Sequence, residues 1–405
     1  MEKEFLTQTF RSVTLNVTAG RIDSFREQDE TSGTVRVYDG DCIGVAGSLG
    51  QCDEAALTAK AEDALALKIP YPCDLGEALV REELREEEII PVPELIPTMQ
   101  AFLDRLGEAC PRFAFSNKIS LNYEKRTYRN SRGRRLASSG RSISIELIAQ
   151  SRGSGNLMDA VFGYCGSHFD PEALLGQFKA QYDAFYRPAD LAPGRYPVVW
   201  EAPGLFESFL PHFSGEMYAS GASLLSGKLG QPAFSEKLTL RDDRNPETNP
   251  GCCFFDAEGC VAPGLRPTLA EKGVLTGVLT TKKSARRFGL PNLGTAQADY
   301  DGVPAPGFRR FYLEPTADRL AALVPGKAIF VGYVSGGDTT PDGHFATPVQ
   351  LAYLMEDGKL AGRLSELNVG GNFYELLSRD YLGAVQGDPM EDSVTCAVIM
   401  DVDKA

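Results

Sequence analysis

Hydrophobic and polar positions alternate with a period of two in several stretches of the chain, a pattern typical of strands with one buried face. The alternation covers residues 35–38 and returns at residues 42–45, on the other side of Asp39 and Gly40. Asp-Gly favours the positive φ angles of a two-residue turn, so this stretch predicts a β-hairpin. The same period recurs between residues 113 and 150, which predicts at least two more antiparallel strands.

Other stretches have helical spacing. Residues 53–67 are rich in Ala, Leu, Glu and Lys and predict a helix that Asp53 caps. Asp170 and Pro171 predict the start of another helix that continues to about Tyr186. Short helices are expected at residues 284–288 and 373–377. A further helix follows Pro93, with one buried face made of Leu95, Ile96, Met99, Phe102, Leu103 and Leu106.

The order of these elements predicts an α+β fold. An N-terminal antiparallel sheet with helices is followed by a glycine-rich, largely antiparallel β domain. Pro188, Pro193 and Gly194 indicate a boundary near residues 188–197. The predicted domains are therefore residues 1–190 and 195–405, and the first divides further into sub-domains 1–90 and 110–190.

Charge argues against nucleic acid as a general ligand, because a formal net charge of −14 repels phosphate backbones. One basic segment is an exception, and it contains Lys125, Arg126, Arg129, Arg132, Arg134, Arg135 and Arg141. It is compatible with a patch for nucleic acid or an acidic peptide. A turn at residues 130–133 and the flanking alternation favour a solvated hairpin instead.

The chain contains no stretch of about 18 apolar residues that would predict a membrane helix. Its first four residues, Met-Glu-Lys-Glu, lack the pattern of a secretory signal. Nine scattered cysteines favour reduced thiols rather than a disulfide framework. We therefore expect a cytoplasmic protein.

Common catalytic motifs are absent from the sequence. Residues 221–228 resemble a phosphate-binding loop but have one residue too many between the glycines. There is no G-x-S-x-G nucleophile motif and no G-x-G-x-x-G dinucleotide motif. Only three histidines are present, and Cys252, Cys253 and Cys260 lack the spacing of a zinc knuckle. A self-contained zinc site is not indicated.

A series of short segments, taken in order, resembles the TldD/PmbA family, the so-called modulators of DNA gyrase. In the second half these are residues 200–206, 214–218, 226–230, 234–243, 255–259, 271–275, 284–285, 355–359 and 370–373. Residues 33–37 and 130–133 add support from the first half. The resemblance implies a cytoplasmic heterodimeric protease that trims unfolded peptides such as leader sequences, with zinc in the TldD subunit only.

The resemblance also implies which subunit type this is. A TldD-like helix displays His-Glu-x-x-x-His, whereas residues 207–212 here are Glu-Ser-Phe-Leu-Pro-His. Only His212 is retained; Glu207 would have to replace an imidazole, and Ser208 cannot act as the base. The family's third ligand is a cysteine near the C-terminus, where Cys396 is more simply a buried strand residue. These departures predict a TldE-like subunit that binds no metal or other cofactor, with zinc in a TldD-like partner.

The partners implied are a TldD-like catalytic subunit or a second copy of the chain, together with an extended peptide substrate. By position near the altered motif, we expect Glu207, His212, Glu216 and Lys228 to line the peptide cleft. Two alternatives remain open from the sequence. One is a free-standing atypical metallopeptidase that uses Glu207 and His212, and the other is a nucleic-acid or gyrase-associated adaptor that uses residues 126–141.

Overall fold

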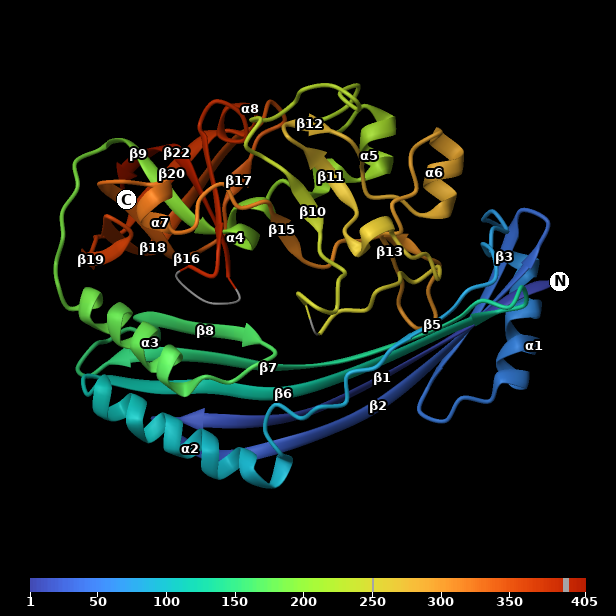
Figure 1. Ribbon diagram of the computed structural model, residues 1–405, viewed down its shortest axis with the longest axis horizontal. Coiled ribbons are helices and arrows are strands. Elements are labelled where there is room, and N and C mark those ends of the chain that lie inside the picture. Colours follow the sequence, from blue (N-terminus) through green and yellow to red (C-terminus); the bar gives the residue numbers. More distant parts are fainter. Residues whose placement is uncertain (250, 389–392) are drawn as a thin grey trace.

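The first part of the chain forms a long, strongly curved sheet on which the second part sits (Figure 1). The computed structural model describes residues 1–249, 251–388 and 393–405. The sheet has the order β4-β3-β2-β1-β6-β7-β5, and β8 pairs with β7. Its strands are β1 (Glu2–Thr18), β2 (Arg21–Asp39), β3 (Cys42–Leu49), β4 (Ile69–Pro70), β5 (Val80–Glu83), β6 (Phe113–Asn130), β7 (Arg135–Ser151) and β8 (Ala160–Gly166).

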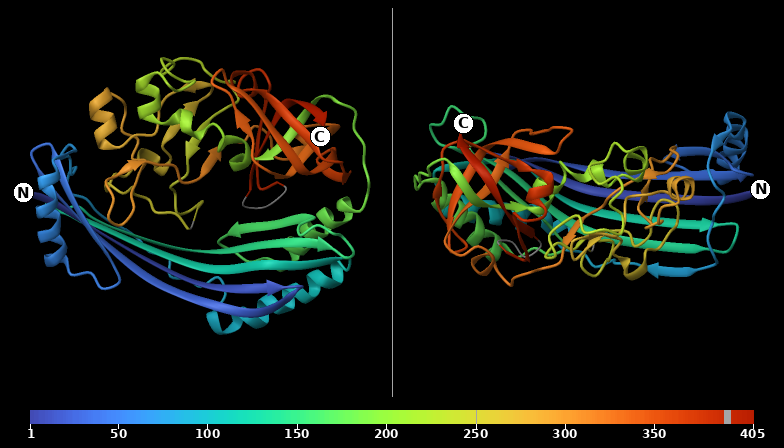
Figure 2. Two further views of the ribbon diagram at one scale, coloured as in Figure 1. Left: turned by 180° about the vertical axis from the view of Figure 1, so that it is seen from behind. Right: turned by 90° about the horizontal axis from the view of Figure 1, so that it is seen from above.

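Three helices accompany this sheet: α1 (Glu54–Ala64), α2 (Val92–Ala109) and α3 (Pro171–Phe185). All three were predicted, and the side chains of Asp53 and Asp170 cap α1 and α3 as expected. The predicted apolar face of α2 is buried except for Ile96. Helices α1 and α2 cover the convex face at opposite ends, and the second part of the chain faces the concave side (Figures 1 and 2).

The second part contains a closed ring of five strands. In the ring β9 pairs with β16 and β22, β20 pairs with β22 and β18, and β18 pairs with β16. The strands are β9 (Gly194–Glu201), β16 (Lys327–Val334), β18 (His344–Glu356), β20 (Leu367–Asn372) and β22 (Val394–Lys404). Closure leaves these five strands without a free edge along their paired lengths. Strands β17 (Asp338–Thr339), β19 (Lys359–Arg363) and β21 (Tyr381–Gln386) pair with members of the ring.

Between β9 and β16 the chain makes a long excursion of short elements. These are α4 (Ala202–Phe206), η2 (Leu210–Phe213), α5 (Gly215–Ser220), β10 (Leu240–Asp242), η3 (Pro263–Leu265), β11 (Thr268–Glu271), β12 (Val274–Leu275), α6 (Lys282–Phe288), β13 (Ala296–Gln297), β14 (Ala305–Pro306), β15 (Phe311–Leu313) and α7 (Leu320–Leu323). Helix α8 (Phe373–Leu376) follows β20, and η1 (Leu65–Leu67) extends α1. The predicted α+β class is confirmed, since antiparallel pairing dominates: among the strands of the described residues, only the pairs β5–β7 and β9–β16 run parallel.

The two parts share a hydrophobic core. Residues of β6, β7, α2 and α3 belong to the same buried cluster as Val199, Phe330, Tyr353 and Ala397 of the ring. A second contact between the two parts lies at the other end of the first sheet, where the Thr34 hydroxyl donates to the Tyr300 carbonyl. Among the described residues, no helix is long and apolar enough to cross a membrane.

Two features of the first part lie outside the elements predicted from the sequence. The polar stretch 23–30 continues β2 without interruption, although its side chains show no hydrophobic alternation. It pairs with β1 on one side, while β3 covers the other side only from Ser32 to Asp39. The charged run 81–88 contributes its first residues to β5, which pairs in parallel with β7.

Candidate functional site

The altered motif lies on an irregular helical path after β9. Helix α4 ends at Phe206, and the chain continues through turns in which Phe209 N–H donates to the Phe206 carbonyl (3.0 Å) and His212 N–H to Phe209 (3.0 Å). Pro211 is the second residue of η2, near its start, where its missing N–H costs no hydrogen bond. Glu207 is exposed just after α4, and Ser208 is half-buried.

His212 is held against the loop that follows α5. The Leu224 backbone N–H donates to its Nδ1 at 3.3 Å, and the Ser223 hydroxyl donates to its carbonyl oxygen at 2.5 Å. The imidazole ring lies 5.9 Å from the Phe373 ring. Burial lowers the pKa of His212, which favours the neutral form. In a neutral imidazole whose Nδ1 accepts a hydrogen bond, the proton is on Nε2. The Nε2–H group of His212 can therefore donate a hydrogen bond to another molecule.

Lys228 lies close to the same loop and to the residue that follows Phe373. Its ammonium lies 4.0 Å above the Tyr374 ring, and the Tyr374 hydroxyl donates to the Leu224 carbonyl at 2.7 Å. Burial lowers the pKa of Lys228. We call His212, Leu224, Lys228, Phe373 and Tyr374 the histidine shelf. It joins two of the residues that the sequence singled out.

Glu207 and Glu216 are not joined to the histidine shelf by any side-chain hydrogen bond or ion pair in the described part of the chain. Glu216 accepts a hydrogen bond from the Ser214 hydroxyl at 3.2 Å and is exposed. The geometry therefore brings His212 and Lys228 together and leaves the two glutamates as separate exposed carboxylates.

The residues present do not fit the zinc ion that the family motif would hold. The only lone pair on the neutral His212 ring is engaged by Leu224 N–H, and an Nε2 that carries a proton cannot ligate. Cys396 lies fully buried in β22 opposite Trp200, and burial raises the pKa of its thiol to about 12. A thiol in that state is a poor zinc ligand, because zinc binds thiolate.

A denser polar cluster lies where the excursion meets the first sheet, and sequence reasoning assigned it no role. The Glu258 carboxylate accepts hydrogen bonds from the Tyr71 hydroxyl and from Lys282 N–H, and the Lys282 ammonium donates to the Glu258 carbonyl at 3.0 Å. Asp256 accepts from the backbone N–H groups of Glu258 and Cys260, both at 2.8 Å. Burial, and then the Asp256 charge, raises the pKa of Glu258 to about 8.

This cluster continues into the first sheet through a buried ion pair. Arg36 donates to Glu4 at 2.9 Å and to the Ala257 carbonyl at 2.5 Å. The hydroxyls of Tyr38 and Tyr128 also donate to Glu4, at 3.0 and 2.8 Å. We call the whole set the junction cluster: Glu4, Arg36, Tyr38, Tyr71, Tyr128, Asp256, Glu258, Cys260 and Lys282. Residues 255–259 of this cluster were among the segments that resemble the family, but the sequence assigned them no function.

Asp256, Glu258 and Cys260 form the only group of three potential metal ligands within reach of one another in the described residues. The carboxylate oxygens of Asp256 and Glu258 already accept backbone and tyrosine donors, and the Lys282 ammonium supplies the local positive charge. The arrangement can hold the two parts of the chain together, and it offers no open position for an ion.

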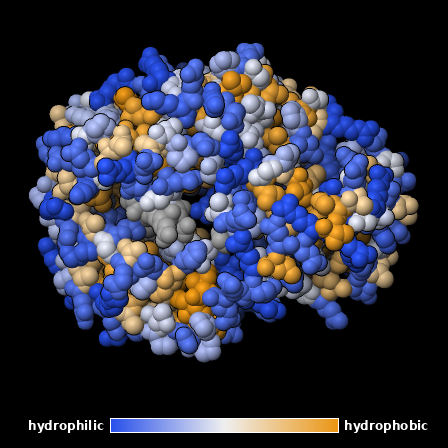
Figure 3. Space-filling view, in the orientation of Figure 1, coloured by the Kyte–Doolittle hydropathy of each residue, from blue (hydrophilic) through white to orange (hydrophobic). Residues whose placement is uncertain are grey.

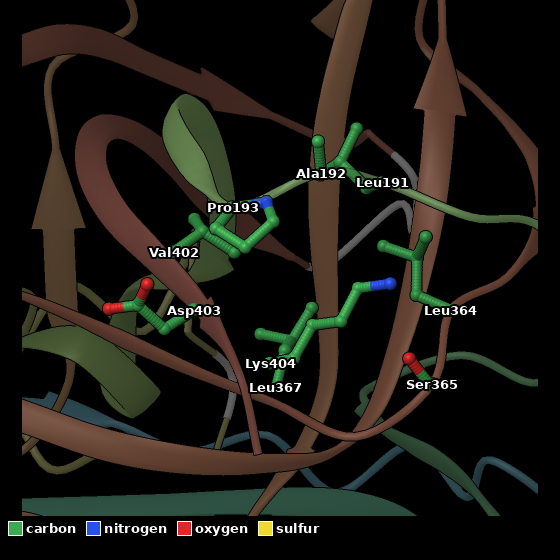
Figure 4. A pocket seen from close by; sticks show the side chains of 9 residues that line it. All are labelled: Leu191, Ala192, Pro193, Leu364, Ser365, Leu367, Val402, Asp403 and Lys404. Carbon is green, nitrogen blue, oxygen red and sulfur yellow. The ribbon is translucent and has the colours of Figure 1, made fainter.

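A pocket between the connector 191–193 and the ends of β20 and β22 is not a candidate site (Figure 4). Its volume of about 10 Å³ is no more than the space for about one water molecule. The Asp403 carboxylate and the Lys404 ammonium point in opposite directions, and Lys404 pairs with Asp190 at 3.1 Å.

Four of the seven basic residues of this segment are held by contacts within the first part of the chain or with residue 259, three of them in ion pairs. The ion pairs are Arg126 with Glu124, Arg129 with Glu54 and Arg132 with Glu2. Arg134 donates to the carbonyls of Glu77 and Gly259. These contacts favour the solvated-hairpin interpretation of the basic segment over a free cationic patch.

Comparison with known proteins identifies the class. The profile of the PmbA/TldA metallopeptidase C-terminal domain matches residues 193–395. A "Metalloprotease" of Methanothermobacter thermautotrophicus is 29% identical over 191 residues, which are 45% of this chain and 41% of that protein. A "Metalloprotease TldD homolog" of Haemophilus influenzae is 27% identical over 216 residues, 52% of this chain and 44% of that protein. The alignments thus span less than half the length of these curated relatives.

Solved structures extend the likeness to the whole fold. TldE from Thermococcus kodakarensis superposes with a TM-score of 0.77 at 20% identity, over 100% of this chain and 96% of that one. A proposed modulator of a DNA gyrase from Thermotoga maritima gives 0.76 at 19% identity, over 99% and 96%. Fold and matched domain define a metalloprotease-like protein. The chain belongs to the TldD/PmbA family.

Proposed function

We propose that the chain is the accessory, TldE-like half of a cytoplasmic two-subunit peptidase whose zinc is held by a TldD-like partner. The observation that carries the proposal is the state of the altered motif. His212 uses its Nδ1 lone pair on Leu224 N–H, and Ser208 stands where a catalytic base is needed. A catalytic zinc site requires about three protein ligands and a base for the attacking water. Glu207, Ser208 and His212 supply neither.

In this role the chain would help to enclose the partner's peptide cleft. A hollow lies between the curved sheet and the second part of the chain (Figure 3). Glu207, His212, Glu216 and Lys228 would line the surface facing the partner. His212 would contribute a hydrogen-bond donor at Nε2, and Lys228 a cation whose position is fixed by Tyr374.

The substrates in this proposal are extended, unfolded or leader peptides. The five-strand ring offers no free edge along its paired lengths, so main-chain pairing would use other strands. The outer side of β2 between residues 23 and 30 is one such edge, because β3 ends its pairing at Ser32. Backbone pairing of this kind selects for extended conformation rather than for sequence.

The full-length superposition on TldE from Thermococcus kodakarensis supports the accessory assignment, although the likeness is one of fold. A second copy of the chain is the competing partner. We also propose that the chain divides into domains 1–190 and 195–405, on either side of the segment that leads into β9. The shared core then makes the two domains one unit in folding.

The proposal is tested by metal analysis and peptide cleavage. The purified chain, a TldD-like partner with an intact His-Glu-x-x-x-His motif, and their mixture are each assayed for zinc and for cleavage of an unfolded peptide. We expect no zinc and no cleavage from the chain alone, and faster cleavage by the mixture than by the partner alone. Stoichiometric zinc and cleavage by the chain alone, both lost in His212→Ala, would overturn the proposal.

A further inference from the structure

A cavity of about 480 Å³ lies on the convex face of the first sheet, between α1 and α2 and away from the histidine shelf. Its floor crosses four neighbouring strands, β2, β1, β6 and β7, and residues 88–92 before α2 form its wall. Val13, Leu121, Ile89 and Ile90 give it an apolar middle. A volume of this size is within the range of about 300–1,000 Å³ typical of ligand sites.

Arg141 lies at the β7 end of the cavity, where the described part of the chain gives it no anionic partner. Within residues 1–249, 251–388 and 393–405, its buried Nε has no hydrogen-bond acceptor and no carboxylate pairs with its guanidinium. The guanidinium carbon lies 4.8 Å from the centre of the Tyr123 ring. The other arginine in the cavity, Arg11, pairs with Asp29 at 3.0 Å. A partly buried guanidinium that finds no internal carboxylate is suited to an anion from outside.

The β2 end of the cavity has the opposite charge. Glu27 is exposed on the cavity face and forms no ion pair in the described part of the chain. Two residues away on the same face, Phe25 is 55% exposed and extends the apolar rim. Three strand spacings separate β2 from β7, which is about 14 Å, or about four residues of extended chain.

We propose that this cavity binds a short apolar peptide with free ends, its carboxylate at Arg141 and its ammonium near Glu27. The middle residues then lie on Val13 and Leu121. Phosphate-bearing ligands fit less well, because Glu27, Asp29 and Glu88 also line the cavity. This site goes beyond the proposed function: it holds a peptide by its side chains and ends on the face of the first sheet that is turned away from the second part of the chain, and it needs no partner subunit.

Calorimetric titration of the chain alone with the tetrapeptide Ala-Val-Leu-Leu tests the proposal. We expect saturable binding at one site, and about tenfold to a hundredfold weaker binding of the C-terminal amide, since one charge-assisted contact is lost. N-acetylation should weaken binding less, because Glu27 is exposed. Decanoic acid serves as an apolar carboxylate without a peptide backbone or an ammonium, and it should bind more weakly than the tetrapeptide.

Arg141→Met should bind the acid and the amide equally, at the level of the wild-type amide complex. Lys125→Met is the matched control, since it removes a positive charge from the same face of β6 outside the cavity, and it should bind as the wild type does. If Arg141→Met does not fold, Glu27→Gln replaces it, with loss of the preference for the free amine as its expected result.

The proposal is wrong if the acid and the amide bind the wild type equally, or if no binding occurs at millimolar peptide. Tighter binding of decanoic acid than of the tetrapeptide would also overturn it, in favour of a lipid-type ligand. None of these results bears on the zinc and cleavage test, because the titration is done without the partner.

Discussion

The junction cluster and the histidine shelf are both polar, yet they are built in opposite ways. In the junction cluster Glu4 and Arg36 are each 1% exposed, and three donors converge on the Glu4 carboxylate. On the histidine shelf His212 is half-buried and has one side-chain hydrogen bond. Many hydrogen bonds among buried polar groups compensate the cost of removing them from water. Where polar groups form few hydrogen bonds with one another, they remain available to bind another molecule.

The difference indicates which region holds the fold together and which is available for function. The junction cluster connects β1 and β2 to residues 256–258, which are more than 200 positions away in the chain. Gly259 lies so close to Tyr128 that a Cβ would come within 2.4 Å of its ring. The histidine shelf, in contrast, depends on residues near an exposed loop. Substitutions at Arg36, Glu258 and His212 test this contrast.

The largest expected effect is that of Arg36→Met. It leaves the Glu4 carboxylate buried without its cation, which costs about 3–5 kcal/mol in free energy of unfolding. Chemical denaturation measures the loss. Arg105→Met removes the solvent-exposed partner of Glu172, so it should leave the free energy of unfolding nearly unchanged and serves as the control.

The double variant Glu4→Gln/Arg36→Met separates a charge effect from a packing effect. Removing both charges should restore part of the stability lost in Arg36→Met, because no uncompensated carboxylate is left. A double variant as unstable as the sum of the two single variants would mean that shape rather than charge pairing holds the junction.

A second effect, which depends on pH, is expected from the raised pKa of Glu258, about 8 against the ordinary 4.5. The folded protein binds this proton more tightly than the unfolded chain, so the contribution is full below pH 4.5 and lost as pH rises to about 8. The slope from one such group is at most about 1.4 kcal/mol per pH unit. Glu258→Gln should remove it.

The measurement is chemical denaturation of Glu258→Gln and of the wild type at pH 5, 6, 7 and 8. The stability of the variant relative to the wild type should increase steadily over this range. A difference that is the same at all four values would show that Glu258 is ionised throughout, and that Lys282 and Tyr71 compensate its charge fully.

Local signals explain how much of the fold could be predicted. Asp39-Gly40 marks the β2–β3 hairpin, and the caps at Asp53 and Asp170 mark helices, because each acts on its own neighbours. The closed ring was not predicted, since β9 meets β22 across nearly 200 residues. The strand at residues 23–30 was missed because it is an exposed edge with no buried side to impose alternation.

The candidate site was predicted less well, for a related reason. Residues 207–212 were singled out by resemblance, and that assignment stays a prediction; the hydrogen-bond donor to His212 is a backbone N–H at Leu224, which no side-chain pattern encodes. Tyr374 is remote in sequence from Lys228. The junction cluster joins Glu4, Arg36, Tyr71 and Glu258, whose proximity arises only from the tertiary fold.

The smallest expected change in the free energy of unfolding is that of substitutions at His212. They test directly whether the histidine shelf contributes less to stability than the junction cluster does. His212→Ala leaves the half-buried Leu224 N–H without its acceptor, which costs about 1 kcal/mol in free energy of unfolding. In His212→Asn the side-chain oxygen stands near the position of Nδ1 and can accept the same bond, so this variant should keep the stability of the wild type.

Neither variant should change the zinc content of the chain with its TldD-like partner, and each should lower cleavage by the mixture to a similar, modest extent, since both lack the Nε2 donor. A histidine that acted as a metal ligand would give another pattern. Both variants would then lose metal and activity alike, whatever their stability, because an asparagine amide does not replace an imidazole as a zinc ligand.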